Sequence, residues 1–248
     1  QARGLYTFSS HLRWTWAIAL GYAASIAVHL FTATGVVCAL LAASAVMVGD
    51  YEGMFIWLGV AFVVDAVDGT FARMVRVEER LPRFSGERLD LVIDYVTYVF
   101  IPTLALVHAG YLPGLWGGVL AALILLSSLF HFSDTESKAA DNSFIGFPAV
   151  WNLIAFYIFA FDMPPFAAAA VVVTCVVLTF VPWRWVHPMR VVSLRALTLG
   201  LSALWAVAAI WIVAGGFPAP LGPKLILAAV AVYALALVVI RRGDPAME

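Results

Sequence analysis

Charged residues are scarce in this sequence, and their scarcity excludes most soluble folds. Only 12% of the 248 residues are Asp, Glu, Lys or Arg, whereas 64% are hydrophobic and the mean hydropathy is +0.98. Soluble domains are on average about one quarter charged. The apolar runs are also as long as a helix needs to cross the hydrocarbon core, roughly 17 to 25 residues. The composition therefore predicts an integral membrane protein.

Other features that are absent narrow the class further. The net charge is −1 and the pI is about 6.6, so no basic excess argues for a nucleic-acid partner. The apolar runs lack the alternation of a membrane-spanning β-strand, which argues against a barrel. The only two cysteines, Cys38 and Cys175, lie inside apolar runs, where buried thiols are expected in place of a disulfide or a metal pair.

The apolar runs predict an all-α membrane protein with eight spans in a single membrane domain, residues 1–248. Short breaks that contain Gly or Pro separate them. Residues 11–30 precede the first span with no polar turn, and their polar side chains share one helical stripe, which predicts an interfacial amphipathic helix. The predicted spans are 31–48, 54–72, 89–109, 112–132, 147–161, 166–181, 194–215 and 221–240.

The basic residues predict how the chain is oriented. With eight spans, both termini and the loops around 73–88, 133–146 and 182–193 lie on one side of the membrane. Of the 14 Lys and Arg, all except Lys224 lie on that side. Loops rich in Lys and Arg face the cytoplasm, so we expect the termini to be cytoplasmic.

Four aspartates interrupt the apolar sequence at what should be a single depth in the membrane. Asp65 and Asp68 lie near the cytoplasmic end of the second span, and Asp90 and Asp94 lie near the cytoplasmic start of the third. An ionised Asp at the centre of a spanning helix costs roughly 2.5 to 3.5 kcal/mol. Exposure to lipid is therefore excluded, and the aspartates need a hydrated cavity, counter-cations or both.

Helical spacing predicts that the two acidic pairs form facing surfaces. An arc of about 100° on the second span carries Asp65, Asp68, Gly69 and Ala72, with Arg73 at its edge. A similar arc on the third span carries Gly86, Asp90, Asp94 and Thr97. Carboxylates without nearby His or Cys suit Mg²⁺ or Mn²⁺, and one or two such ions can neutralise a diphosphate. Structural ion pairs with Arg73, Arg76 or Arg88, or a pathway for protons or cations, are the alternatives.

The same residues resemble the motif of the CDP-alcohol phosphotransferases. The pattern is Asp65-x2-Asp68-Gly69-x2-Ala72-Arg73, twelve further residues, then Gly86-x3-Asp90-x3-Asp94. The commonest form of the motif has a shorter gap, and the longer one resembles the bacterial phosphatidylcholine synthase branch. The stretches "AVHLFTATG", "FIGFPAVWN" and "FVPWRWVHPMR" resemble that branch too.

The resemblance implies a role for each motif residue. All four aspartates would hold one or two Mn²⁺ or Mg²⁺ ions on the diphosphate of CDP-diacylglycerol, and Asp94 would also be the general base. The CDP part would be lined by Gly69, Ala72, Arg73 and Gly86. Residues 31–181 would form a six-helix catalytic core with the site at 65–94, followed by two additional spans at 194–240. A homodimer in the bacterial inner membrane, with a cytoplasmic active site, is also implied.

The acceptor alcohol that the resemblance implies is choline. Choline is a permanent cation, so its pocket should offer aromatic faces and a carboxylate, for which Tyr98, Trp151 and Asp141 are the first candidates. Loop 133–146 holds three acidic residues against one lysine, which favours a cationic acceptor over an anionic one. Serine, inositol or glycerol phosphate are the alternative acceptors. A cation transporter is the alternative from another class, although little polar sequence follows Thr97 in the third span.

Overall fold

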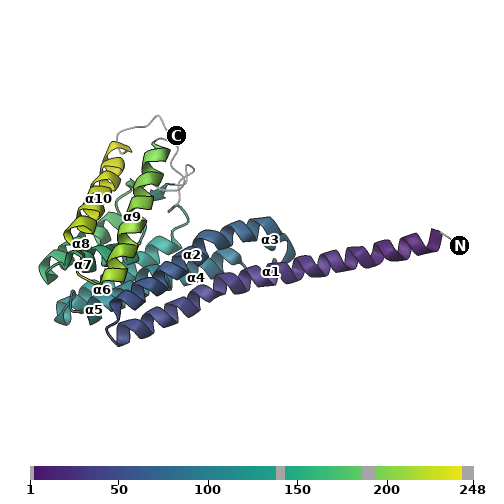
Figure 1. Cartoon of the computed structure of the whole chain (residues 1–248), viewed down its shortest axis with the longest axis horizontal. Helices are drawn as coiled ribbons and strands as arrows, with labels where there is room; N and C mark the ends of the chain where they lie inside the picture. Colours follow the sequence, from purple (N-terminus) through teal and green to yellow (C-terminus); the bar gives the residue numbers. More distant parts are fainter. Residues whose placement is uncertain (1–2, 138–142, 186–193, 242–248) are drawn as a thin grey trace.

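Helices make up most of the described chain, and they pack into one bundle from which a long N-terminal helix projects (Figure 1). The computed structural model describes residues 3–137, 143–185 and 194–241, and within these ranges the side chains of residues 19–240. The long helices at the start are α1 (Arg3–Met47) and α2 (Tyr51–Val75). The remaining elements are α3 (Val77–Arg80), α4 (Gly86–Asp94), the π-helical turn η1 (Tyr95–Phe100), α5 (Ile101–His108), α6 (Gly114–Ser133), β1 (Phe144–Ile145), α7 (Trp151–Phe161), α8 (Pro165–Thr179), β2 (Arg184–Trp185), α9 (Arg195–Gly215) and α10 (Leu221–Arg241).

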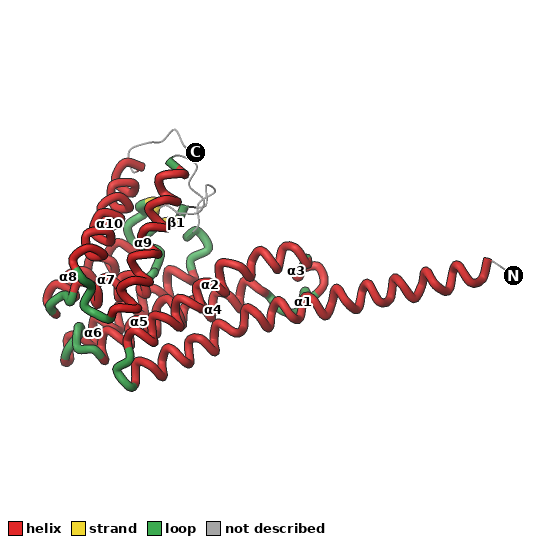
Figure 2. The backbone as a smooth tube through the Cα atoms, in the orientation of Figure 1, coloured by secondary structure: helices red, strands yellow, loops and turns green. Residues whose placement is uncertain are grey.

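The helices confirm the prediction of an all-α integral membrane protein (Figure 2). By length and composition, six segments of the described chain can cross a membrane. The shorter apolar helices are α7, with 11 residues, and α8, with 15. At about 1.5 Å per residue, α7 is only about 16 Å long, which is shorter than the hydrocarbon core. The six segments are Ala19–Met47, Tyr51–Val75, Gly86–His108, Gly114–Ser133, Arg195–Gly215 and Leu221–Ile240.

Hydrogen bonds join turns that are far apart in the sequence. At one end, the Tyr111 hydroxyl donates to Asp162, 3.3 Å away, and the Phe217 N–H donates to Glu52, 2.9 Å away. The first bond joins the turn after α5 to the turn after α7. The second joins the turn after α9 to the start of α2. At the other end β1 pairs antiparallel with β2. That second end also carries the turn between α2 and α4, where the aspartate motif lies.

The fifth predicted span begins later than the sequence indicated. We expected a helix over 147–161, but α7 begins at Trp151. Gly146 has φ +80° and Ala149 has φ +54°, and Pro148 lies between them, so the backbone cannot enter a helix there. The Phe147 N–H instead donates to the Leu178 carbonyl at 3.0 Å. This buried, non-helical segment ties the start of α7 to the end of α8.

Gly146→Ala is expected to destabilise the protein by roughly 1 to 3 kcal/mol, which is the cost of one strained backbone position. A Cβ at this residue would collide with the Thr179 carbonyl oxygen, and the positive φ adds strain. Thermal unfolding in detergent measures the effect. Gly118→Ala, in a helix with open space around it, is the matched control and should not lower the melting temperature. An unchanged melting temperature in the Gly146 variant would contradict the packing described here.

The N-terminal part of the chain differs from the expected interfacial helix followed by a separate span. A single helix, α1, runs from Arg3 to Met47 and projects well beyond the other helices (Figure 1). The segment contains no proline, so no residue forces a break near residue 30. Helix α1 packs against both α3 and α4. The position of residues 11–30 at the membrane interface stays a prediction.

The two C-terminal helices dock on α7. The Phe217 ring, in the turn between α9 and α10, packs against Phe55 and Phe156, with centroids 5.3 and 5.7 Å apart. The Tyr157 hydroxyl of α7 donates to the Leu227 carbonyl of α10 at 3.0 Å. These contacts join α9 and α10 to the rest of the bundle. The division into a catalytic core and two additional spans stays a prediction.

Candidate metal centre

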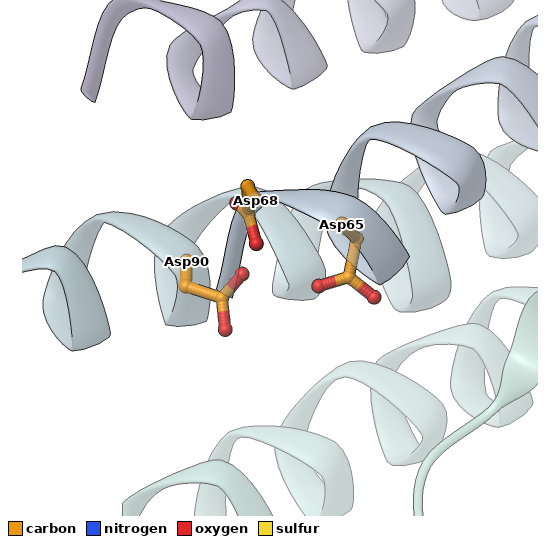
Figure 3. Close-up of side chains that lie close together, drawn as sticks. All are labelled: Asp65, Asp68 and Asp90. Atoms are coloured by element: carbon orange, nitrogen blue, oxygen red, sulfur yellow. The ribbon is translucent and has the colours of Figure 1, made fainter. Parts of the chain in front are cut away.

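Three of the four motif aspartates converge on one point (Figure 3). Asp65 and Asp68, three residues apart on α2, lie on the same helical face, and Asp90 of α4 faces them. Each offers one carboxylate oxygen, and these oxygens all lie within 4.8 Å of one another. The predicted meeting of the two acidic surfaces is thus confirmed for these three residues.

The packing of α4 on α1 places Asp90 at this point. A Cβ added to Gly35 of α1 would lie 2.7 Å from the Ile93 Cγ2 atom of α4, so only glycine permits so close an approach. Ser85 caps α4, because its hydroxyl accepts the Arg88 N–H at 3.2 Å. The Ser85 cap therefore fixes where α4 starts, and the close contact at Gly35 fixes how α4 lies against α1.

The protein groups around Asp65 and Asp68 do not neutralise their charge. Asp68 is buried, with 7% of its surface exposed, and the Thr32 side chain and the Gly69 N–H lie near its carboxylate. Asp65 accepts a hydrogen bond from the Tyr98 hydroxyl at 2.7 Å. Within the described ranges, neither carboxylate forms an ion pair with an arginine or lysine. Two like charges 4.8 Å apart, the largest separation of the clustered oxygens, repel by about 3.5 kcal/mol at an effective dielectric constant near 20.

This environment fits a hard divalent cation. All of the ligand atoms are carboxylate oxygens, which suits Mg²⁺ or Mn²⁺ and not the softer metals that prefer His and Cys. A bound cation would also offset the repulsion among carboxylates that otherwise must share a partly buried site. The three aspartates therefore make a site that can bind a divalent metal ion.

Asp94 lies outside the group of three. It is the last residue of α4, one turn beyond Asp90, and its carboxylate is not among those within mutual reach. Asp65, Asp90 and Asp94 all lie near enough to the Tyr98 hydroxyl to act on it electrostatically. The structure thus places Asp94 beside the cluster. Its roles as a metal ligand and as the general base stay predictions.

The other motif residues surround the cluster on α2 and α4. Arg73 is exposed, and its guanidinium donates to the Thr70 hydroxyl at 3.2 Å. Among the described residues, the only atom near a Cβ built on Gly69 belongs to that guanidinium, at 3.5 Å. A glycine within a helix costs about 1 kcal/mol relative to alanine. The packing of the described residues does not explain why glycine is present at residue 69 in spite of this cost. The close approach of a ligand to the backbone would explain it. A role in binding CDP stays a prediction for Gly69, Ala72, Arg73 and Gly86.

Sequence reasoning missed the contribution of α1 to this region. Thr32 reaches Asp68, and His29 Cε1 lies 3.4 Å from a Cβ built on Gly86. His29 Nε2 is buried and has no hydrogen-bond partner in the part of the chain that the structure describes. The sequence did contain an indication of this contact, because His29 and Ser25 belong to the polar stripe on residues 11–30. Ser25 is fully buried, so part of that stripe faces the protein.

Two of the three candidates for the choline pocket, Trp151 and Tyr98, lie among the described residues. Trp151 is fully buried, and its indole N–H donates to the Ser128 hydroxyl at 2.8 Å. Tyr98 is half-buried and bonds to Asp65, which puts it at the metal centre. Asp141 lies outside the described residues. A role for each of them in binding choline stays a prediction.

Similarity to known proteins shows to which family the chain belongs. The chain is 44% identical to the phosphatidylcholine synthase of Bradyrhizobium diazoefficiens over 211 residues, which cover 85% of this chain and 79% of the relative. It is 42% identical to the phosphatidylcholine synthase of Rhizobium johnstonii, over 79% of this chain and 81% of the relative. The chain belongs to the phosphatidylcholine synthase family. The enzyme of that name from Pseudomonas aeruginosa is 41% identical over 73% of this chain and 76% of its own length. No family model matches the sequence.

Membership in the phosphatidylcholine synthase family confirms the resemblance drawn from the aspartate motif. The protein is therefore an enzyme, a CDP-alcohol phosphatidyltransferase. The aligned region includes most of the chain, so the kinship is not limited to the motif. Its apolar helices make it a multi-pass membrane member of that family.

Proposed function

We propose that the protein transfers a phosphatidyl group from CDP-diacylglycerol to choline in a reaction that requires a divalent metal ion. The observation that carries the proposal is the convergence of Asp65, Asp68 and Asp90 from two helices at one end of the bundle. The names of the relatives support phosphatidylcholine as the product. Because the motif lies near the ends of spans, a lipid donor and a soluble acceptor can both reach it.

The proposed mechanism gives the aspartates two tasks. Asp65, Asp68 and Asp90, with Asp94 beside them, would hold one or two Mn²⁺ or Mg²⁺ ions. A bound divalent ion supplies a positive charge that neutralises the diphosphate and the departing CMP. Asp94 would accept the proton of the choline hydroxyl, because a neutral alcohol is a weak nucleophile. The choline oxygen then bonds to the phosphorus that carries diacylglycerol, and the bond from that phosphorus to the CMP oxygen breaks.

The remaining motif residues would bind the nucleotide. Gly69 and Gly86 lack side chains, so the CDP part can approach the backbone of α2 and α4 closely. Arg73 offers an exposed guanidinium for a phosphate oxygen, and its bond to Thr70 keeps it near Gly69. Ala72 adds no bulk on the same face of α2. The choline pocket would draw on aromatic residues near this end of the bundle, with Trp151 and Asp141 as candidates.

The proposed function includes a cellular location. The basic loops and the aspartate motif share one side of the predicted topology, which we assign to the cytoplasm of a bacterial cell. The membrane would then be the inner membrane, with both termini cytoplasmic. A homodimer is the assembly that the superfamily resemblance implies.

Metal-dependent formation of phosphatidylcholine by the purified protein is the test. Protein in detergent would be supplied with CDP-diacylglycerol and labelled choline, and both the lipid product and CMP would be measured. With Mn²⁺ or Mg²⁺ we expect equal amounts of phosphatidylcholine and CMP. An excess of chelator should abolish both, and a further addition of metal should restore them.

Other acceptors in the same assay separate the alternatives. CMP release with serine, inositol or glycerol phosphate, and none with choline, would overturn the choice of acceptor. Full turnover in excess chelator would overturn the metal site. A transport function needs a polar path beyond the site, yet the buried residues of α5 are Ile101, Pro102, Thr103, Ala105 and Leu106. The Thr103 hydroxyl among them bonds to the Val99 carbonyl at 2.7 Å, so it does not extend such a path.

A further inference from the structure

A short side-chain hydrogen bond at the metal centre joins the segments Tyr51–Val75 and Gly86–His108. The Tyr98 hydroxyl, in η1, donates to Asp65 Oδ2, in α2, at 2.7 Å. A distance of this size is typical of a hydroxyl bound to an ionised carboxylate. The bond therefore restrains the orientation of one of the three clustered carboxylates.

The backbone around Tyr98 explains how the bond arises. Pro102 has no N–H and its ring would crowd the carbonyl of residue 98 in a regular α-helix. The helix widens instead into the π-helical turn η1, in which the Ile101 N–H donates to the Val96 carbonyl. Such turns inside α-helices are frequent at functional sites. Here η1 follows directly on Asp94, so its side chains lie next to the acidic cluster.

The chemistry of a phenol suits the orientation of a metal ligand. A tyrosine hydroxyl donates one hydrogen bond and adds no positive charge, so Asp65 keeps its negative charge for a cation. A carboxylate also has two oxygens, and occupying one of them leaves the other for coordination. Groups that hydrogen-bond to metal ligands fix the ligands' orientation and raise metal affinity.

We propose that Tyr98 is a positioning residue that orients Asp65 to bind the divalent metal ion, and that it does not line the choline pocket. The inference rests on the metal site of the proposed function. It differs from the prediction made from the sequence, in which Tyr98 was a candidate aromatic wall for choline. The two roles separate cleanly, because the first needs the hydroxyl and the second needs only the ring.

Tyr98→Phe removes the hydroxyl and keeps the ring, so it tests the two roles directly. We expect the affinity for Mn²⁺, measured without substrates by the spin-resonance signal of the free ion, to fall about tenfold or more. The KM for choline at saturating Mn²⁺ should be unchanged. Activity should recover as Mn²⁺ is raised, which would not happen if the variant were misfolded.

Tyr95→Phe is the matched control. Tyr95 lies in the same turn, but its hydroxyl donates to the Leu125 carbonyl at 2.9 Å, away from the carboxylates. Its loss should leave Mn²⁺ affinity unchanged. Equal Mn²⁺ affinity in the wild type and Tyr98→Phe would overturn the positioning role alone. A wild-type protein that binds no Mn²⁺ would overturn the metal site and this inference together.

Discussion

Asp68→Asn should reduce phosphatidylcholine formation at least about 10²- to 10³-fold, the loss seen when one preorganised charge-stabilising group is removed from an active site. Asp68 is the most buried of the three clustered carboxylates. Asparagine keeps its shape but removes its charge, and a neutral amide is a much weaker ligand for a divalent ion. The initial rate of CMP release at several Mn²⁺ concentrations measures the loss.

The same substitution should raise stability when no metal is present. The cluster brings three negative charges within 4.8 Å, and removing one of them relieves both repulsion and the burial of a charge. We therefore expect the metal-free variant to melt at a higher temperature than the metal-free wild type. The stabilisation that Mn²⁺ gives the wild type should disappear. A structural role for Asp68 predicts the opposite sign, namely a lower melting temperature.

Asp162→Asn is the control for the removal of a carboxylate elsewhere in the protein. Asp162 lies at the other end of the bundle, where it accepts the Tyr111 hydroxyl, and its φ is +49°. Asparagine tolerates this left-handed backbone conformation well. Turnover and Mn²⁺ binding should stay near the wild-type values. Normal turnover and Mn²⁺ stabilisation in Asp68→Asn would remove that residue from the proposed site.

Asp94→Asn should lower kcat by about 10²- to 10⁴-fold, the usual contribution of a general base. The structure makes this variant different from Asp68→Asn, because Asp94 is not one of the three carboxylates within mutual reach. Mn²⁺ affinity should therefore fall less in Asp94→Asn than in Asp68→Asn. Single-turnover transfer to choline, together with a Mn²⁺ titration of the substrate-free protein, measures both quantities.

The two variants together assign the roles of the aspartates. Loss of turnover with Mn²⁺ binding largely kept would support Asp94 as the base. An equal loss of Mn²⁺ affinity in both variants would instead make Asp94 mainly a metal ligand. Near-normal turnover in Asp94→Asn would exclude it as the base and leave the proton to another acceptor.

Much of the architecture could be predicted because lipid imposes a simple rule on sequence. A helix satisfies all of its backbone hydrogen bonds within itself, so long apolar runs in a membrane protein indicate helices. The spacing of the aspartates then identified one helical face on each of two consecutive spans. For Asp65, Asp68 and Asp90 this local geometry was sufficient, because both helices begin or end at the same side of the bundle.

The prediction was less accurate where the backbone depends on distant contacts. Residues 147–150 are apolar, yet they are not helical, because Gly146 and Ala149 take positive φ and the Phe147 N–H bonds to α8. The third span was expected to be a regular helix, and only the folded chain shows that a π-helical turn accommodates Pro102. The expected boundary between residues 30 and 31 is absent for a different, local reason, because no proline interrupts α1.

The sequence by itself determined the membrane class, the all-α fold and the acidic motif, since all of these follow from composition and helical periodicity within short segments. Only the tertiary structure decided which carboxylates meet, that Tyr98 bonds to Asp65, and that Thr32 and His29 of α1 reach the same region. The physical reason is that these contacts depend on how helices rotate and approach one another. Gly35 lets α1 and α4 come close, and no local pattern in either helix specifies that distance.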